Sequence, residues 1–211
     1  DNYICTKCGS IPRERALMLC IDKYFPNWRE LTIHESSPAV RGASERLRNN
    51  GKNYIPSQYF EGIKSGEMHK GFLCEDLENL SFEDNSIDLH VTQDVFEHLF
   101  DPQKAFQEIA RTLKPGGAHI FTTPLINKDK PTQFCAVRGV NGAVTDRNVP
   151  KEYHGNPVST EGSLVTVHWG YDITHYIQAA CGLSTQIVYL DDLQYGIRAE
   201  FIEVLITRKP L

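Results

Sequence analysis

The stretch Ser86-Ile-Asp-Leu-His-Val-Thr92, with the residues that follow it to position 123, decides the fold of this 211-residue chain. Every second residue of the stretch is apolar, which is typical of a strand. Apolar residues then recur at helical spacing over 103–113. Lys114-Pro-Gly-Gly117 is expected to end that helix, because proline lacks an amide donor and glycine turns freely. Residues 118–123 are predicted to form the next strand.

The same alternation of strands and helices extends outward in both directions. The expected elements are a helix after Pro12, a strand at 30–33, a helix at 40–48, strands at 53–55 and 72–74, a helix from Asp172 to Cys181, and strands at 185–190 and 201–207. This order predicts an α/β fold with a doubly wound, mostly parallel sheet. The last two strands are joined only by residues 191–200, so we expect an antiparallel pair at one edge.

Composition excludes several classes of function. The chain has 27 acidic and 22 basic residues and a formal net charge of −5. This mild acidity disfavours nucleic acid and anionic membranes as partners. No apolar run approaches the roughly 20 residues of a spanning helix, and the first residues do not resemble a signal peptide. We therefore expect a cytoplasmic protein, and the sequence indicates no oligomeric state.

The cysteines point to reduced thiols rather than to a disulfide framework, because the six are spread along the predicted elements. Cys5 and Cys8 form half of a zinc knuckle within an N-terminal arm and helix, residues 1–27. A four-ligand zinc site needs two more thiols or imidazoles, and no second CxxC pair follows. We predict no metal site, with one alternative: zinc completed by ligands from outside this chain.

The motifs between residues 72 and 124 resemble those of a known protein family. Its pieces occur in order: Cys74-Glu-Asp-Leu-Glu-Asn-Leu-Ser-Phe82, Asp84-Asn-Ser-Ile-Asp88, Gln93-Asp-Val-Phe-Glu-His98, Asp101-Pro102 and Leu113-Lys-Pro-Gly-Gly117. Together they resemble the middle of class I S-adenosyl-L-methionine (AdoMet) dependent methyltransferases of the small-molecule type. The resemblance implies a Rossmann-like methyltransferase domain over 28–211, with AdoMet as cofactor and residues 125–171 as a lid-like insertion.

The resemblance also implies the residues that contact the cofactor. Asp76, followed by Leu77, stands where the family accepts a hydrogen bond from the adenine amino group. Gln58, with Ser57 beside it, stands where the family holds the ribose hydroxyls, which donate to an amide oxygen. Gln93 and Asp94 follow the fourth strand, where the chain would lie along the adenosine and near the methyl group.

One part of the family pattern is replaced. The usual glycine-rich loop after the first strand lets the backbone approach the methionine end of the cofactor. Here that place holds His34-Glu-Ser-Ser-Pro38. Within this loop, Glu35 is expected to face the cofactor's ammonium, and Ser36 and Ser37 its carboxylate.

Three residues are candidates for catalysis. Asp94 and His98 lie near the predicted mouth of the site, and either is a possible base for a protonated acceptor. Alternatively, Asp94 only contacts the cofactor or starts a helix, and His98 only packs or caps that helix. His154 lies in the 125–171 segment, whose other polar and aromatic residues include Arg138, Arg147, Tyr153 and Trp169.

The long 125–171 segment has two interpretations. Its hydrogen-bonding and aromatic side chains suit an acceptor pocket, or the aromatic residues only bury one another. The predicted function is methyl transfer from AdoMet to a small-molecule or glycan-like acceptor. The alternative is a methyltransferase-like binding module without catalysis.

Overall fold

The structure is a computed structural model that describes residues 3–139, 143–146, 150–156 and 159–211. Within these ranges, eight strands form one sheet in the order β13-β14-β6-β5-β1-β2-β4-β3. They are β1 (Thr32–Ser36), β2 (Asn53–Gln58), β3 (Met68–His69), β4 (Phe72–Cys74), β5 (Ile87–Gln93), β6 (Leu113–Thr122), β13 (Ser184–Val188) and β14 (Val204–Arg208).

The centre of the sheet is parallel and its two edges are antiparallel. Parallel pairing joins β4 to β2, β2 to β1, β1 to β5, and β5 to β6. At one edge β14 runs antiparallel to both β6 and β13, which confirms the predicted antiparallel pair. The other edge also ends in an antiparallel strand, the short β3, which periodicity did not predict.

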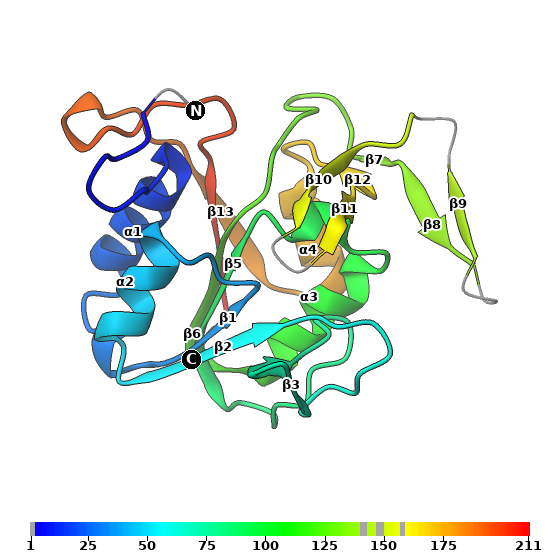
Figure 1. The fold of residues 1–211 in the computed structure, drawn as a ribbon, viewed down its shortest axis with the longest axis horizontal. Helices are drawn as coiled ribbons and strands as arrows, with labels where there is room; N and C mark the ends of the chain where they lie inside the picture. Colours follow the sequence, from blue (N-terminus) through cyan, green and yellow to red (C-terminus); the bar gives the residue numbers. More distant parts are fainter. Residues whose placement is uncertain (1–2, 140–142, 147–149, 157–158) are drawn as a thin grey trace.

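Helices cover both faces of the sheet, as Figure 1 shows. Four α-helices lie in the described residues: α1 (Pro12–Tyr24), α2 (Gly42–Asn50), α3 (Pro102–Thr112) and α4 (Ile173–Cys181). Single 3-10 turns are η1 (Trp28–Glu30), η2 (Phe96–His98) and η3 (Leu193–Tyr195). The doubly wound α/β fold is therefore confirmed, and no described helix is long and apolar enough to cross a membrane.

Two apolar cores, one on each face, follow from the alternation of side chains along the strands. Ala118 and Ile120 of β6 pack with α1 and α2, whereas Phe121 packs with α3 and α4. Leu17 and Ile21 of α1 are fully buried in the first of these cores, where they pack with residues of the sheet. The N-terminal helix thus packs directly against the strands.

Several local predictions need correction. β1 extends to Ser36, so the first three residues of the expected loop are strand. The helix expected at 40–48 begins only at Gly42, and Val40, which precedes it, is 89% exposed. Asp172 does not cap α4 with its side chain. Its carboxylate instead accepts hydrogen bonds from the Thr132 backbone and hydroxyl.

The segment between β6 and α4 forms three small two-stranded sheets within the described residues. Its strands are β7 (Gln133–Phe134), β8 (Ala136–Arg138), β9 (Val144–Asp146), β10 (Tyr153–Asn156), β11 (Ser159–Leu164) and β12 (Val167–His168). In Figure 1 the β8–β9 hairpin projects from the body, whereas β10 and β11 lie against it. Arg147 lies outside the described residues.

The start of α3 is fixed by Asp101, whose carboxylate accepts a hydrogen bond from the Lys104 backbone amide at 3.0 Å. We expect Asp101→Ala to lower the free energy of unfolding by about 1 kcal/mol, because an unpaired helix amide is left behind. Asp101→Asn keeps an acceptor and should lower it by much less. Urea unfolding measures both; equal losses for the two variants would contradict a capping role.

Candidate active site

A cavity of about 1040 Å³ opens at the carboxyl ends of the parallel strands. This is where ligands bind in open α/β sheets, and the volume matches the upper range of small-molecule pockets. The lining includes these residues predicted from sequence: Ser36, Ser37, Gln58, Asp76, Leu77, Gln93, Asp94, His98 and His154. The fold therefore brings most of the predicted site residues to one place, while their roles stay predictions.

His34 and Ser57 do not line this cavity, which corrects the expected side-chain contacts with the cofactor. Both side chains are fully buried, and His34 Nε2 lies 2.7 Å from Ser57 Oγ. The other nitrogen of His34 lies 2.9 Å from His90 Nδ1. Burial lowers the pKa of His34 to about 3, so this imidazole is neutral. The cause of the difference is that β1 continues through His34 and directs its side chain into the core.

Glu35 is also absent from the cavity wall, and lies one layer beneath it. Its buried carboxylate accepts hydrogen bonds from Ser44 Oγ, Tyr54 Oη and Gln93 Nε2 at 2.6, 2.7 and 2.8 Å. Burial raises the pKa of Glu35, and the three donors oppose that shift. Glu35 therefore positions Gln93, whose side chain does line the cavity, instead of facing a cofactor ammonium itself.

Two non-glycine residues hold left-handed backbone at the strand ends. Ser37, after β1, has φ 56°, and Asp94, after β5, has φ 52°. Their amides bind neighbouring strands: Ser37 N donates to Ser57 O and Asp94 N to Thr122 O, each at 2.9 Å. Strained backbone of this kind collects at functional sites. Ser37 thus turns the chain out of β1 in left-handed backbone without a glycine.

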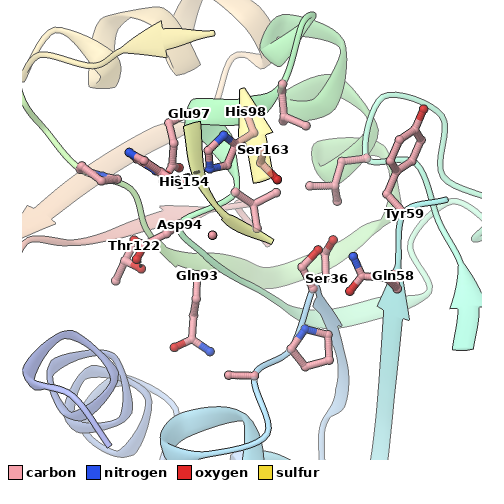
Figure 2. A pocket seen from close by; sticks show the side chains of 18 of the residues that line it. Ser36, Gln58, Tyr59, Gln93, Asp94, Glu97, His98, Thr122, His154 and Ser163 are labelled. Carbon is pink, nitrogen blue, oxygen red and sulfur yellow. Dashed lines mark hydrogen bonds and ion pairs between the residues drawn. The ribbon is translucent and has the colours of Figure 1, made fainter. Parts of the chain in front are cut away.

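One end of the cavity is formed by β2, β4 and the lid. The Asp76 backbone amide donates a hydrogen bond to Ser65 Oγ at 3.0 Å, and its Oδ1 accepts one from the Glu78 amide at 2.9 Å. Tyr59, which follows Gln58, borders the same end, as Figure 2 shows. Arg138 of β8 stands over the Phe100 ring, 4.3 Å from its centroid. Tyr59 was not among the residues predicted from the sequence, although its position directly after Gln58 pointed to it.

At the middle of the cavity, Asp94 is held from two sides. Arg13 of α1 forms an ion pair with its Oδ2 at 2.9 Å, and Thr122 Oγ1 donates to its Oδ1 at 3.1 Å. Burial, reinforced by the charge of Glu97, raises the pKa of Asp94, whereas Arg13 lowers it. The N-terminal helix therefore contributes a charged residue to the site, which was not among the predicted site residues.

The opposite end gathers acidic and imidazole side chains under the β10–β11 hairpin (Figure 2). Glu97 is buried, and its Oε1 lies 3.7 Å from His98 Nε2 and 3.8 Å from His154 Nδ1. The two carboxylate oxygens of Glu152 each accept a hydrogen bond of 3.1 Å, one from His154 Nε2 and the other from His168 Nε2. The carboxylates of Glu97 and Glu152 raise the pKa of His154 to about 9. A histidine that holds its proton at neutral pH is unsuited to act as a base.

Both interpretations of the 125–171 segment apply, each to a different part. Trp169 is fully buried among the aromatic rings of α3 and α4, so this part of the segment serves packing. His154, Ser163 and Leu164 line the cavity instead. His98 also has both properties, because it lines the cavity while its Nδ1 donates to the Leu164 carbonyl at 2.9 Å.

Comparison with known proteins agrees with this geometry. A family described as methyltransferase domain matches residues 24–121. A glycine/sarcosine/dimethylglycine N-methyltransferase of Actinopolyspora halophila is 40% identical over 48 residues, 23% of this chain and 8% of the relative. A ubiquinone biosynthesis O-methyltransferase of Coxiella burnetii is 29% identical over 80 residues, 38% of this chain and 31% of the relative. The matches thus span well under half of either relative's length.

Solved structures show the same fold. An S-adenosylmethionine dependent methyltransferase from Mesorhizobium loti superposes with a TM-score of 0.58 at 16% identity, covering 92% of this chain and 98% of the other. Residues 24–121 therefore match a methyltransferase domain, and the described chain has the fold of that AdoMet-dependent methyltransferase. The resemblance found in the sequence is confirmed at the level of family and fold.

Proposed function

We propose that this protein binds AdoMet in the cavity at the strand ends and transfers its methyl group to a small-molecule or glycan-like acceptor. The observation that carries the proposal is the convergence of Gln58, Asp76 and Asp94, from three separate strand ends, on one cavity. A cavity of about 1040 Å³ has room for a cofactor and for a second molecule beside it.

The chemistry of the lining assigns a direction to the cofactor. Asp76 and Gln58 offer acceptors for the adenine amino group and the ribose hydroxyls. Ser36 and Ser37, at the end of β1, offer donors for the cofactor carboxylate. With the two ends so placed, the methyl group points toward Asp94 and the cluster of Glu97, His98 and His154.

The protein's contribution to the reaction is alignment. AdoMet, when bound, would supply a methyl group on a sulfonium that leaves as a neutral thioether once the acceptor atom has bonded to the methyl carbon, and the residues of the cavity would hold the two molecules in line. An oxygen or nitrogen acceptor must also lose its proton. The cluster at the β10–β11 hairpin lies where that proton would leave, and it supplies polar atoms that orient a hydroxylated or aminated acceptor.

The acceptor class is supported by charge and by similarity. The chain has a net charge of −5, which opposes binding of nucleic acid. The relative from Coxiella burnetii is named for an O-methylation in ubiquinone biosynthesis, which is small-molecule chemistry. We therefore place the acceptor among small molecules and glycan-like compounds, with the lid segment as its binding wall.

Calorimetry with AdoMet and S-adenosylhomocysteine tests the cofactor half of this proposal. We expect saturable binding of both at one site per chain, with dissociation constants below a millimolar. No binding at millimolar concentration would overturn the proposal. For the transfer, AdoMet with a labelled methyl group is incubated with acceptor pools, and labelled product is measured. Cofactor binding without transfer to any pool would favour the alternative, a binding module without catalysis.

A further inference from the structure

We propose that Glu97, His98 and His154 form a binding site for a divalent transition-metal ion at the acceptor side of the cavity. Each of the three offers one ligand atom, and these atoms lie within 4.8 Å of one another. In the described part of the chain no other group of three such residues meets this condition. No metal was predicted at these residues from the sequence, because His154 joins Glu97 and His98 only through folding.

The carboxylate of Glu97 has one oxygen prepared for a ligand. Its Oε2 accepts a hydrogen bond from Thr123 Oγ1 at 3.0 Å, which fixes the orientation of the group. Its Oε1 is buried and has no hydrogen-bond partner. A buried, unpaired carboxylate oxygen is costly unless something occupies it. The oxygen faces the two imidazoles, so a cation between them would relieve that cost.

The distances favour a shared ion over direct hydrogen bonds. Glu97 Oε1 lies 3.7 Å from His98 Nε2 and 3.8 Å from His154 Nδ1, beyond ordinary hydrogen-bond length. Two ligands of a tetrahedral ion with bonds of about 2.0–2.2 Å stand roughly 3.3–3.6 Å apart. The two distances from the carboxylate oxygen therefore exceed that spacing by only a few tenths of an ångström, and the two imidazole nitrogens lie within 4.8 Å of each other.

The outer nitrogen of each imidazole is already engaged. His98 Nδ1 donates to the Leu164 carbonyl, which can only accept, so the proton of the neutral ring resides on Nδ1. His154 Nε2 lies 3.1 Å from a Glu152 oxygen, and the other oxygen of Glu152 lies 3.1 Å from His168 Nε2. Carbonyl and carboxylate partners on the far nitrogen are the usual support of metal-binding histidines. The inner nitrogen of His98 can therefore direct a lone pair at an ion beside Glu97 Oε1, and that of His154 can do so once the ion has displaced its proton.

The ligand set selects the class of metal. Two imidazoles with one carboxylate suit zinc, iron(II), cobalt(II) or manganese(II), whereas magnesium and calcium prefer oxygen ligands alone. Three protein ligands leave positions open, and all three residues line the cavity. If the proposed function holds, an acceptor oxygen would occupy an open position, which favours hydroxylated acceptors. The binding of the metal itself does not depend on that function.

Titration with cobalt(II) tests the site, because its visible absorption reports nitrogen and oxygen ligands directly. The protein is first given Cys5→Ser and Cys8→Ser, which removes the thiol pair near the N-terminus as a competing site. We expect one equivalent to bind with a dissociation constant in the micromolar range or below, and zinc to displace it. Glu97→Gln and His154→Gln should each weaken binding at least 10-fold, since loss of supporting residues alone costs 10- to 100-fold.

The matched control is His175→Gln, which removes an exposed histidine of α4 and should leave cobalt binding unchanged. Circular dichroism must show each variant folded before its affinity is compared. The proposal is overturned if no saturable binding occurs at millimolar cobalt, or if the Glu97 and His154 variants bind as tightly as their parent. Metal binding is measured without AdoMet, so failure to bind AdoMet would count against the proposed function alone.

Discussion

Replacement of Trp169 by alanine is expected to lower the free energy of unfolding by about 3–5 kcal/mol, the usual cost of emptying a large aromatic site. The side chain is fully buried. Its ring centroid lies 5.3 Å from that of Tyr176, 6.3 Å from Phe134 and 6.5 Å from Phe106. Trp169 thus joins the end of the lid segment to α3 and α4, and its loss leaves a cavity between them.

The comparison with phenylalanine sharpens this prediction. Trp169 Nε1 is buried without a hydrogen-bond partner, so the indole contributes volume rather than a polar contact. Trp169→Phe keeps most of that volume and should cost much less than the alanine variant. Urea unfolding followed by circular dichroism measures both. A loss below about 1 kcal/mol for the alanine variant would show that the lid is not anchored here.

Replacement of Asp76 by alanine is expected to weaken AdoMet binding by about 1–3 kcal/mol, which is roughly 5- to 150-fold in Kd. The proposed reason is the loss of an acceptor for the adenine amino group. Asp76 also has a structural task, because its Oδ1 accepts the Glu78 amide at 2.9 Å. The alanine variant therefore removes a turn as well as a ligand contact, and a second variant is needed to separate the two.

Asp76→Asn provides that separation. Its amide oxygen can still accept from the Glu78 backbone, while its amide nitrogen would meet the adenine amino group donor to donor. We expect Asp76→Asn to weaken AdoMet binding while leaving thermal stability near that of the parent. Glu83→Ala, at an exposed position shortly after β4, serves as the control and should bind normally. Unchanged affinity in both Asp76 variants would place the adenine elsewhere.

The loop after β1 lacks glycine, and the buried Glu35 supports the cavity wall beside it. Glu35 would be a plausible partner for the cofactor if it were exposed, yet three donors hold it under Gln93. Ser37 turns the chain out of β1 at the cost of left-handed backbone. The replaced loop therefore has a structural account in these residues: Ser37 turns the chain, and Glu35 supports the Gln93 side chain that lines the cavity.

The sequence by itself determined the order of the layers and the chain positions that border the cavity. Alternation along 86–92 and helical spacing over 103–113 are local patterns, set by the geometry of one strand and one helix. They predicted β5 and α3 nearly to the residue. Because strands of a parallel sheet end at a common edge, they also brought Gln58, Asp76 and Asp94 to one side without any knowledge of contacts.

Only the tertiary structure decided which side chains meet there. Whether His34 faces the cofactor depended on how far β1 continues, and one more strand residue reverses a side chain. The pairing of Arg13 with Asp94, and of Glu97 with His154, joins segments far apart in the chain. No periodicity relates such residues, since their approach is set by the packing of α1 and of the lid onto the sheet. The fold could therefore be predicted from local patterns, whereas the side-chain contacts at the acceptor side of the cavity could not.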